Sequence, residues 1–227
     1  MSPTNSIPVI AIDGPSASGK GTIAERVANE LNFNYLDSGA LYRLVALAAL
    51  NANIDLNNEK ELSRLARDLN AHFGGNKVYL AENDVSLQIR SESCSKAASQ
   101  VAVWPLVRQA LLSRQREFRK APGLVAEGRD MGSVVFPDAS PKVYLTAGIE
   151  ARAQRRYKQL KEKGIDAKLP DLLQDLRERD ARDSERGIAP LQKCADASML
   201  DTTFLTIDDV VAQVVALYSK GSKGSDY

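Results

Sequence analysis

The chain contains very little cysteine and histidine. Among 227 residues there are two cysteines, Cys94 and Cys194, and one histidine, His72. This is too few for a disulfide framework or for a metal site built from thiolates and imidazoles, so we expect no metal held by protein side chains. We expect both cysteines to behave as small, partly buried hydrophobic residues, and His72, beside a Gly-Gly turn, to lie in a loop or strand.

Excess charge and long apolar segments are also missing. The 30 basic and 29 acidic side chains give a formal net charge of +1, which argues against broad binding to nucleic acid or to a membrane surface. No apolar run approaches the roughly 20 residues that span a bilayer, and the N-terminus lacks both a basic start and an apolar stretch. We therefore expect a cytoplasmic protein with no nucleic-acid and no membrane partner.

Apolar residues predict alternating strands and helices, in a chain long enough for one domain with an inserted subdomain. After a first strand that ends before Gly14, the expected strands are 34–37, 124–126, 142–147 and 198–200, and the expected helices are 22–31, 40–50, 59–69, 105–119, 150–163 and 207–219. Such alternation predicts an α/β fold with a mainly parallel sheet covered by helices on both faces. We expect flexible ends at 1–8 and 220–227 around a domain spanning 9–219.

One segment departs from this alternation. Residues 72–76 are typical of a hairpin turn, and a second turn is expected at 82–84. The segments 77–81 and 85–89 alternate between apolar and polar residues, as strands do. We therefore predict a small antiparallel β insertion.

The run VIAIDGPSASGKGT, residues 9–22, is the most informative part of the chain. An apolar strand, a glycine-rich loop and a helix start form a cradle for phosphate, because bare N–H groups attract anions and glycines let the backbone curl. Lys20 is placed to reach the β- and γ-phosphates of a nucleoside triphosphate. The expected phosphate-binding residues are Gly14, Pro15, Ser16, Ala17, Ser18, Gly19, Lys20, Gly21 and Thr22.

This run departs in one position from the phosphate-loop pattern G-x-x-x-x-G-K-S/T. Gly21 follows the lysine where a hydroxyl is usual, and Thr22 comes one residue later. Direct binding of magnesium by a hydroxyl is therefore not expected. The alternative interpretation is a glycine- and serine-rich turn that binds nothing.

A charged residue lies inside the apolar helix that follows the strand 34–37. Arg43 sits in the run LDSGALYR, where it would either clamp an acceptor phosphate or extend its charged end into water.

A second charged group, Glu127-Gly128-Arg129-Asp130, comes directly after the strand 124–126, at the end of the sheet where open α/β folds bind ligands. Arg129 suits a phosphate, and Glu127 or Asp130 would orient magnesium-bound water or donor groups of a ligand. A helix cap with a surface ion pair is the alternative.

Arginines recur at helical spacing in RERDARDSER, residues 177–186. Four side chains share one helical face: Arg179, Arg182, Asp183 and Arg186. The preceding helix repeats the spacing with Arg152, Arg155 and Arg156. Neighbouring guanidinium groups repel unless anions lie between them, and phosphoryl transfer requires such cations, so we favour a lid over a merely solvated, salt-bridged helix.

Taken together, these motifs resemble the bacterial-type cytidylate kinases, of the nucleoside monophosphate kinase group. The similar segments are IDGPSASGKGT, LDSGALYR, EGRDMGSVVFPDA, RERDARDSERGIAPL and CADASMLDTT, and the resemblance runs from about Val9 to Leu217. It implies a P-loop kinase fold with a central parallel five-stranded sheet, an acceptor region at about 38–110 that includes a β insertion at about 70–90, and a helical lid at about 152–190. Glu127 replaces an Asp, and Ser38 a Thr, of many relatives.

The resemblance also implies roles for individual residues. It assigns ATP to the phosphate loop and Arg155, with Mg²⁺ held mainly by phosphates and water. It assigns the phosphate of CMP or dCMP to Ser38, Arg43, Arg129 and Arg186, the ribose to Asp183, and the cytosine to Ser99, Arg108 and Asp130. The catalytic group is Lys20, Arg129, Arg179, Arg182 and Arg186.

The expected reaction transfers the γ-phosphoryl group of ATP to CMP or dCMP, with CDP or dCDP and ADP as products, and we expect a monomer. A kinase for UMP or a phosphorylated metabolite is the nearest alternative, because it would differ only in the base-reading residues. A nucleotide-binding switch is a more distant one, because the chain has no guanine-reading N/T-K-x-D segment. RNA binding is disfavoured by the charge balance.

Overall fold

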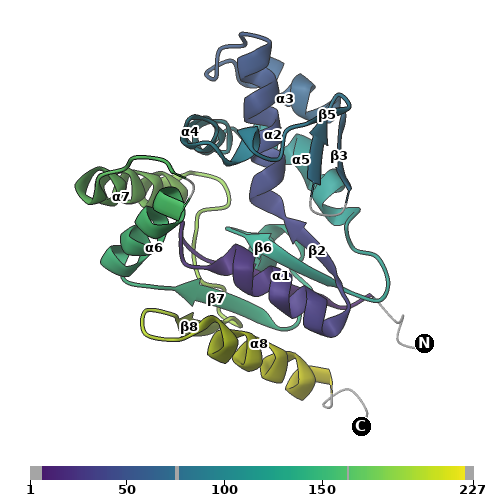
Figure 1. Ribbon diagram of the computed structural model, residues 1–227. Coiled ribbons are helices and arrows are strands. Elements are labelled where there is room, and N and C mark those ends of the chain that lie inside the picture. Colours follow the sequence, from purple (N-terminus) through teal and green to yellow (C-terminus); the bar gives the residue numbers. More distant parts are fainter. Residues whose placement is uncertain (1–6, 75–76, 163, 223–227) are drawn as a thin grey trace, which may run out of the picture. The chain divides into compact units, whose positions relative to one another are not determined.

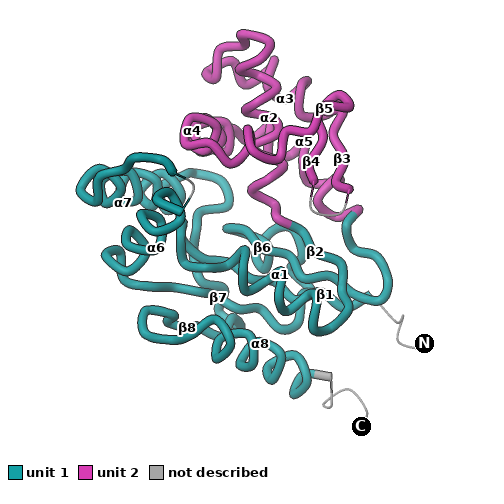
Figure 2. Tube along the Cα trace, viewed as in Figure 1, with its two compact units in different colours: residues 1–36, 118–227 teal, residues 37–117 magenta. Residues whose placement is uncertain are grey.

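The computed structural model describes residues 7–74, 77–162 and 164–222 (Figure 1). The chain forms two compact units (Figure 2): unit 1 comprises residues 1–36 and 118–227, and unit 2 comprises residues 37–117. Most of the ends that were expected to be flexible, 1–6 and 223–227, lie outside the described residues. The last helix, α8, runs from Ile207 to Ser222, so 220–222 are helical and do not belong to a flexible tail.

Unit 1 is built on a parallel sheet with the strand order β2-β6-β1-β7-β8, which confirms the expected five-stranded α/β fold. Its strands are β1 (Val9–Asp13), β2 (Asn34–Asp37), β6 (Leu124–Gly128), β7 (Lys142–Thr146) and β8 (Ser198–Asp201). The central strands β1 and β6 are almost continuously buried, as strands covered on both faces must be.

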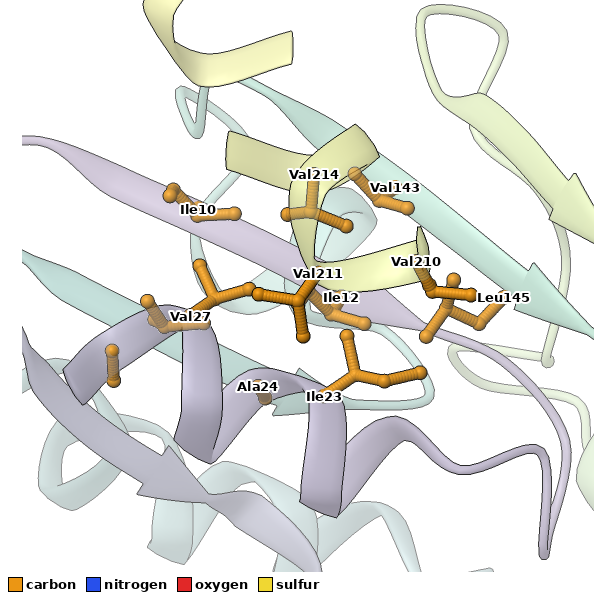
Figure 3. Packing of buried hydrophobic residues seen from close by; sticks show 12 residues of the cluster. Ile10, Ile12, Ile23, Ala24, Val27, Val143, Leu145, Val210, Val211 and Val214 are labelled. Atoms are coloured by element: carbon orange, nitrogen blue, oxygen red, sulfur yellow. The ribbon is translucent and has the colours of Figure 1, made fainter. Parts of the chain in front are cut away.

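Two helices, α1 (Lys20–Leu31) and α8, pack their apolar residues on the sheet of unit 1 (Figure 3). Ile12 from β1, Val27 from α1 and Val214 from α8 belong to this cluster and are fully buried. Burying each such side chain contributes about 1.5–3 kcal/mol to folding. This core holds the carboxyl end of β1 and the start of α1 in place.

The pairing of the strands aligns their carboxyl ends. Asp13, the last residue of β1, pairs with Gly128 of β6 and with Tyr144 of β7, and Thr146 of β7 pairs with Asp201 of β8. The loops that leave these strands therefore start close together at one edge of the sheet. Those loops contain residues 14–19 of the expected phosphate cradle, together with Arg129 and Asp130.

Two further helices of unit 1 pack against each other: α6 (Ile149–Glu162) and α7 (Leu169–Glu185). They cover most of the segment expected to be the lid. A single π-helical turn, η2 (Met131–Val135), follows β6. None of the helices formed by the described residues combines the length and apolar character that crossing a bilayer requires.

Unit 2 contains four helices among its described residues, and a small antiparallel sheet of the predicted kind, ordered β3-β4-β5. The helices are α2 (Ser38–Asn51), α3 (Glu59–Arg67), α4 (Glu92–Val101) and α5 (Pro105–Arg116); the strands are β3 (Ala71–Gly74), β4 (Lys77–Leu80) and β5 (Asn83–Asp84). Residues 75–76 of the expected hairpin turn lie outside the described residues.

The insertion differs from the sequence expectation in its third strand. The segment 85–89 does not extend the sheet: β5 ends at Asp84, and Gln88–Arg90 forms a 3₁₀ turn, η1. The carboxylate of Asp84 accepts hydrogen bonds from the N–H and the hydroxyl of Ser86, and Ser86 Oγ in turn accepts the N–H of Val78 on β4. These side-chain bonds compete with the strand ladder and end the strand early.

Helix α4 was not expected, because its sequence ESCSKAASQV is rich in serine, a modest helix former. Two features compensate. The Ser91 side chain caps the helix by accepting the N–H of Cys94 at 3.2 Å, and α4 packs on the apolar helix α2.

Candidate functional site

The loop between β1 and α1 has the backbone shape of a phosphate cradle. Gly14 has a φ of 152°, and a Cβ there would lie 2.0 Å from the carbonyl oxygen of Leu145. Any side chain at this position would collide with the backbone of β7, so only glycine fits. Gly19 closes the loop in the left-handed conformation, with a φ of 94°.

Helix α1 begins at Lys20, two residues before the expected start at Thr22, and no side chain caps it. The first N–H groups of a helix lack partners within the helix and carry its positive dipole end. Because Gly19 has no side chain to occupy them, the loop and the helix start offer an anion bare N–H groups.

Lys20 is buried beside this loop, and its Nζ donates to the carbonyl oxygen of Pro15 at 2.8 Å. Burial lowers the pKa of Lys20, and the nearby charges of Arg129 and Arg179 lower it further, to about 7, although Glu127 acts in the opposite direction. A cation in such surroundings is stabilised by an anionic ligand.

Arg129, which directly follows β6, connects the phosphate loop with α7. Its Nε donates to Oδ2 of Asp183 at 2.7 Å, and its Nη2 donates to Oγ of Ser16 at 2.8 Å. Burial acts to lower the pKa of Arg129, but Asp183 and Glu127 hold it above its ordinary value. The guanidinium is therefore a fixed cation at the edge of the loop.

Helix α7 gathers further charges around Asp183. Burial alone would raise the pKa of this carboxyl, but Arg129 and Arg179 keep it below its usual range. Arg186 Nη1 lies 4.0 Å from Asp183 Oδ1, and its Nε donates to the carbonyl oxygen of Ala189. Arg182 lies on the same helix, more exposed, with its Nη1 4.0 Å from a carboxylate oxygen of Glu178.

The arginines of α6 hold the phosphate loop from another side. Arg152 is buried and donates to three acceptors: the carbonyl oxygens of Ala147 at 3.0 Å and Ser16 at 3.1 Å, and Oδ2 of Asp180 on α7 at 2.7 Å. It therefore joins β7, the phosphate loop and α7.

Arg155 links the same loop to the segment after β8. Its Nη1 donates to the carbonyl oxygen of Ser18 at 3.3 Å and to Oγ1 of Thr202 at 3.0 Å. The Thr202 hydroxyl is within hydrogen-bonding distance of the carbonyl oxygens of Ser18 and Thr146, at 3.2 and 3.1 Å.

In unit 2, Arg43 is held by the residue that caps its own helix. Asp37 Oδ1 accepts the N–H of Ala40 at 3.0 Å, and Asp37 Oδ2 accepts a hydrogen bond from Arg43 Nη2. A Cβ at Gly39 would lie 3.1 Å from Arg43 Nη1, so the glycine leaves room for the guanidinium to fold back over the helix start. Arg43 is thus an ion-paired side chain and not one that only extends into water. Ser38, the first residue of this helix, is buried.

The three remaining expected substrate residues lie on separate elements. Ser99 is buried on α4 and Arg108 is buried on α5, both in unit 2, whereas Asp130 is buried in unit 1, at the start of η2. Arg108 lies over the ring of Tyr42, 5.6 Å from its centroid, and its Nη1 donates to the carbonyl oxygen of Ala102 at 3.1 Å.

The structure therefore brings the phosphate loop and Arg129 together with Arg152 and Arg155 of α6 and with Arg179, Asp183 and Arg186 of the α7 segment, within unit 1. Arg182 lies on the same helix but is near Glu178. Sequence reasoning missed several residues that hold this group: Asp13, Thr202 and Asp180, and the anchoring role of Arg152. Thr202 lies within the segment CADASMLDTT, so the resemblance to the family contained a signal for it. The contacts of Asp13 and Arg152 depend on residues far away in the sequence.

Comparison with known proteins points to one family. The family model described as cytidylate kinase matches residues 10–220. A cytidylate kinase from Nitrosomonas europaea is 56% identical over 217 residues, which cover 96% of this chain and 97% of that protein. A cytidylate kinase from Bordetella pertussis is 58% identical over 208 residues, covering 92% of this chain and 93% of that protein.

Among solved structures, a gluconokinase from Sinorhizobium meliloti 1021 is similar with a TM-score of 0.50 and 15% sequence identity, covering 96% of this chain and 95% of that one. At this identity the similarity concerns the fold alone.

Proposed function

The chain belongs to the cytidylate kinase family, and we propose that the residues described above carry out the family reaction, in which the γ-phosphoryl group of ATP passes to the 5′-phosphate of CMP or dCMP. The observation that carries this assignment is the group formed by Lys20, Arg129 and Asp183 at the phosphate loop. Fixed cations around a backbone anion cradle are what phosphoryl transfer requires.

ATP fits the loop on the evidence of its backbone. A loop that packs so closely on β7 that only glycine fits at position 14, an uncapped helix start and the buried ammonium of Lys20 are suited to a polyphosphate. We assign Arg155 to the ATP side as well, because it is bonded to the loop at Ser18.

Mg²⁺ would be held by the phosphates and water, since Gly21 offers no hydroxyl next to the lysine. When bound, the ion neutralises phosphate charge and orients the phosphates.

We assign the acceptor nucleotide to the polar side chains that the resemblance to the family singles out. Ser38 and Arg43, with Arg129 and Arg186, would bind its phosphate, and Asp183 its ribose. Cytosine presents a carbonyl, a ring nitrogen and an amino group, which the hydroxyl of Ser99, the guanidinium of Arg108 and the carboxylate of Asp130 match in donor and acceptor character.

The transfer needs no strong general base. An oxygen of the CMP phosphate, already anionic, forms a bond to the γ-phosphorus while the bond from that phosphorus to the β–γ bridging oxygen breaks, and the products are CDP and ADP. Lys20 and the arginines Arg129, Arg179, Arg182 and Arg186 would balance the charge that spreads over the transferring group. Closing the lid would exclude water, which otherwise would hydrolyse ATP.

We also propose that the protein acts as a monomer in the cytoplasm, without nucleic-acid or membrane partners. The near-zero net charge argues against nucleic-acid and membrane-surface partners, and the free cysteines agree with a reducing compartment. The proposed domain comprises residues 9–219, with acceptor and lid regions as expected from the sequence.

A coupled assay of ADP release tests the function directly. With MgATP, the purified chain should turn over CMP and dCMP far faster than UMP, AMP, GMP or dTMP, and should release almost no ADP without an acceptor. Asp130→Ala should weaken the binding of CMP much more than the binding of ATP. ADP release that is independent of acceptor, or turnover with a different acceptor only, would overturn the substrate assignment.

A further inference from the structure

One buried carboxylate has no part in the proposed chemistry. Asp13, the last residue of β1, is only 6% exposed. Its Oδ1 accepts the N–H of Met131 at 2.8 Å, and its Oδ2 accepts the N–H of Gly132 at 2.9 Å. A single side chain on β1 thus binds the chain immediately after Arg129 and Asp130.

These two N–H groups begin the π-helical turn η2. Within the turn, the N–H groups of Val134 and Val135 donate to the carbonyl oxygen of Asp130, and the first N–H groups of a helical turn have no such partner. The side chain of the N-cap residue often supplies one, but Asp130 makes no capping bond. The capping bond comes instead from the side chain of Asp13, 118 residues before Met131 in the sequence.

We propose that Asp13 is a positioning residue for the acceptor side of the reaction. Its carboxylate fixes the turn that follows Arg129 and Asp130 against the end of β1, a task that the side chain of Asp130 does not perform. The inference rests on the proposed function, which assigns these two residues to the acceptor. Two hydrogen bonds to adjacent N–H groups restrain rotation of the turn, and such restraint keeps a reacting geometry within the small tolerance that catalysis allows.

Several charged or titratable groups face Asp13 from the surrounding elements. Lys20 of α1 lowers its pKa and Asp130 raises it, while Tyr144 of β7 and Cys194 are close enough to feel its charge. Lys142 lies against Gly132, one of the two residues that Asp13 binds. These groups affect the pKa of Asp13 or respond to its charge. A variant without the Asp13 carboxylate is therefore needed to identify what Asp13 itself contributes.

Burial raises the pKa of Asp13 to about 6, although its two N–H partners act to lower it. Protonation places a hydroxyl opposite one N–H, so one of the two hydrogen bonds is lost and the turn is held less firmly. Because the folded-state pKa lies above the unfolded value, the proton binds the folded chain more tightly, and stability from this group is gained as pH falls through 6. Positioning and stability should therefore change in opposite directions.

The test compares Asp13→Asn with wild type, and uses Val214→Ala as a matched control. Val214 is fully buried in α8, so its truncation should lower Tm without moving either KM. At pH 7.5, kcat/KM for CMP should fall about tenfold in Asp13→Asn, the effect of one lost charge-assisted hydrogen bond, while KM for ATP stays within about twofold.

The pH dependence separates positioning from a merely structural role. From pH 7.5 to 5.5, the ratio of wild-type to Asp13→Asn kcat/KM for CMP should fall towards one, while the Tm of wild type rises relative to the variant. Titration of the substrate phosphates affects both proteins equally and cancels in the ratio. Asp13 also raises the pKa of Lys20, so kcat/KM for CMP is measured at saturating MgATP, whose phosphates would keep Lys20 protonated in both proteins. An equal rise of KM for CMP and ATP, or a ratio that does not change with pH, would overturn the proposal.

Should Asp13→Asn fail to fold, the wild-type chain still decides the question. In a ¹⁵N-resolved NMR titration, the amide resonances of Met131 and Gly132 and the Nε resonance of Arg129 should shift together with a midpoint near pH 6. Flat resonances between pH 5 and 8 would overturn the proposal. This measurement needs no substrate, so it is independent of whether CMP is the acceptor, which the acceptor panel tests separately.

Discussion

Helices α6 and α7 carry arginines at similar spacing, but the side chains have different partners. Arg152 and Arg155 of α6 donate mainly to backbone carbonyl oxygens, of the phosphate loop and of the residues that follow β7 and β8, and Arg152 also pairs with Asp180 of α7. Arg179 of α7 acts electrostatically on Lys20 and Asp183, which are charged side chains. One helix therefore fixes the loop, and the other surrounds it with charge.

The difference shows that helical spacing alone does not identify a phosphate-binding arginine. An arginine whose donors are taken by buried carbonyl oxygens stabilises the fold, because removing it leaves those acceptors unpaired. An arginine that lowers the pKa of a neighbouring lysine stores electrostatic repulsion that an anion relieves. Substitutions in the two helices should accordingly affect different measurements.

Lys20→Ala should have the largest effect on activity, because Lys20 lies beside the loop that both helices approach. We expect kcat to fall by about 10³, because a preorganised charge is lost where charge develops during transfer. Steady-state kinetics with saturating ATP and CMP measure it, with Tm as the control for folding. Full activity in this variant would remove the phosphate-loop assignment.

Arg179→Ala should lower kcat by about 10² and leave Tm nearly unchanged. It should also raise the pKa of Lys20 above the value of about 7. If the proposed ATP site requires the protonated lysine, kcat/KM for ATP should fall as pH rises above 7 in wild type, and this fall should begin at higher pH in the variant. A pH profile of kcat/KM from 6 to 9 measures the shift. A pH profile that does not shift would show that Arg179 does not lower the pKa of Lys20.

Arg152→Ala should act mainly on stability. It leaves Asp180 and two carbonyl oxygens without their partner, so we expect a loss of about 3 kcal/mol, or roughly 6–12 °C in Tm. The pH at which kcat/KM for ATP falls should stay that of wild type, in contrast to Arg179→Ala. Thermal unfolding and the same pH profile provide the measurement. A shifted profile with unchanged Tm would place Arg152 with the arginines of α7.

Thr202→Val should have the smallest effect. It keeps the volume but removes a hydroxyl that lies near the carbonyl oxygens of Ser18 and Thr146 and accepts from Arg155, so we expect a loss of about 1 kcal/mol and a KM for ATP raised about fivefold. Thr203→Val is the control: it removes a hydroxyl at the neighbouring, half-buried position, which bonds Gly148 and Asp201 but not Arg155. If both variants raise KM for ATP equally, the effect does not pass through Arg155.

Much of the fold was predictable because local patterns agree with it. The buried strand before Gly14, the glycines of the loop and the alternation of strands and helices led to the parallel sheet that the structure contains. The third strand of the insertion and α4 were not predicted. In the first case Ser86 takes over a ladder hydrogen bond, and in the second a serine-rich segment becomes helical by capping and by packing on α2.

The sequence by itself determined the phosphate loop, the family and the identity of the charged side chains, because these depend on residues that are neighbours along the chain. Only the tertiary structure decided which of these charges are fixed, and by what. Asp13 meets the N–H groups of Met131 and Gly132, and Arg152 meets Ser16 and Asp180, across long sequence separations that no local pattern reports. The physical reason is that burial and hydrogen-bond partners, which set both pKa and rigidity, exist only once the strands are aligned.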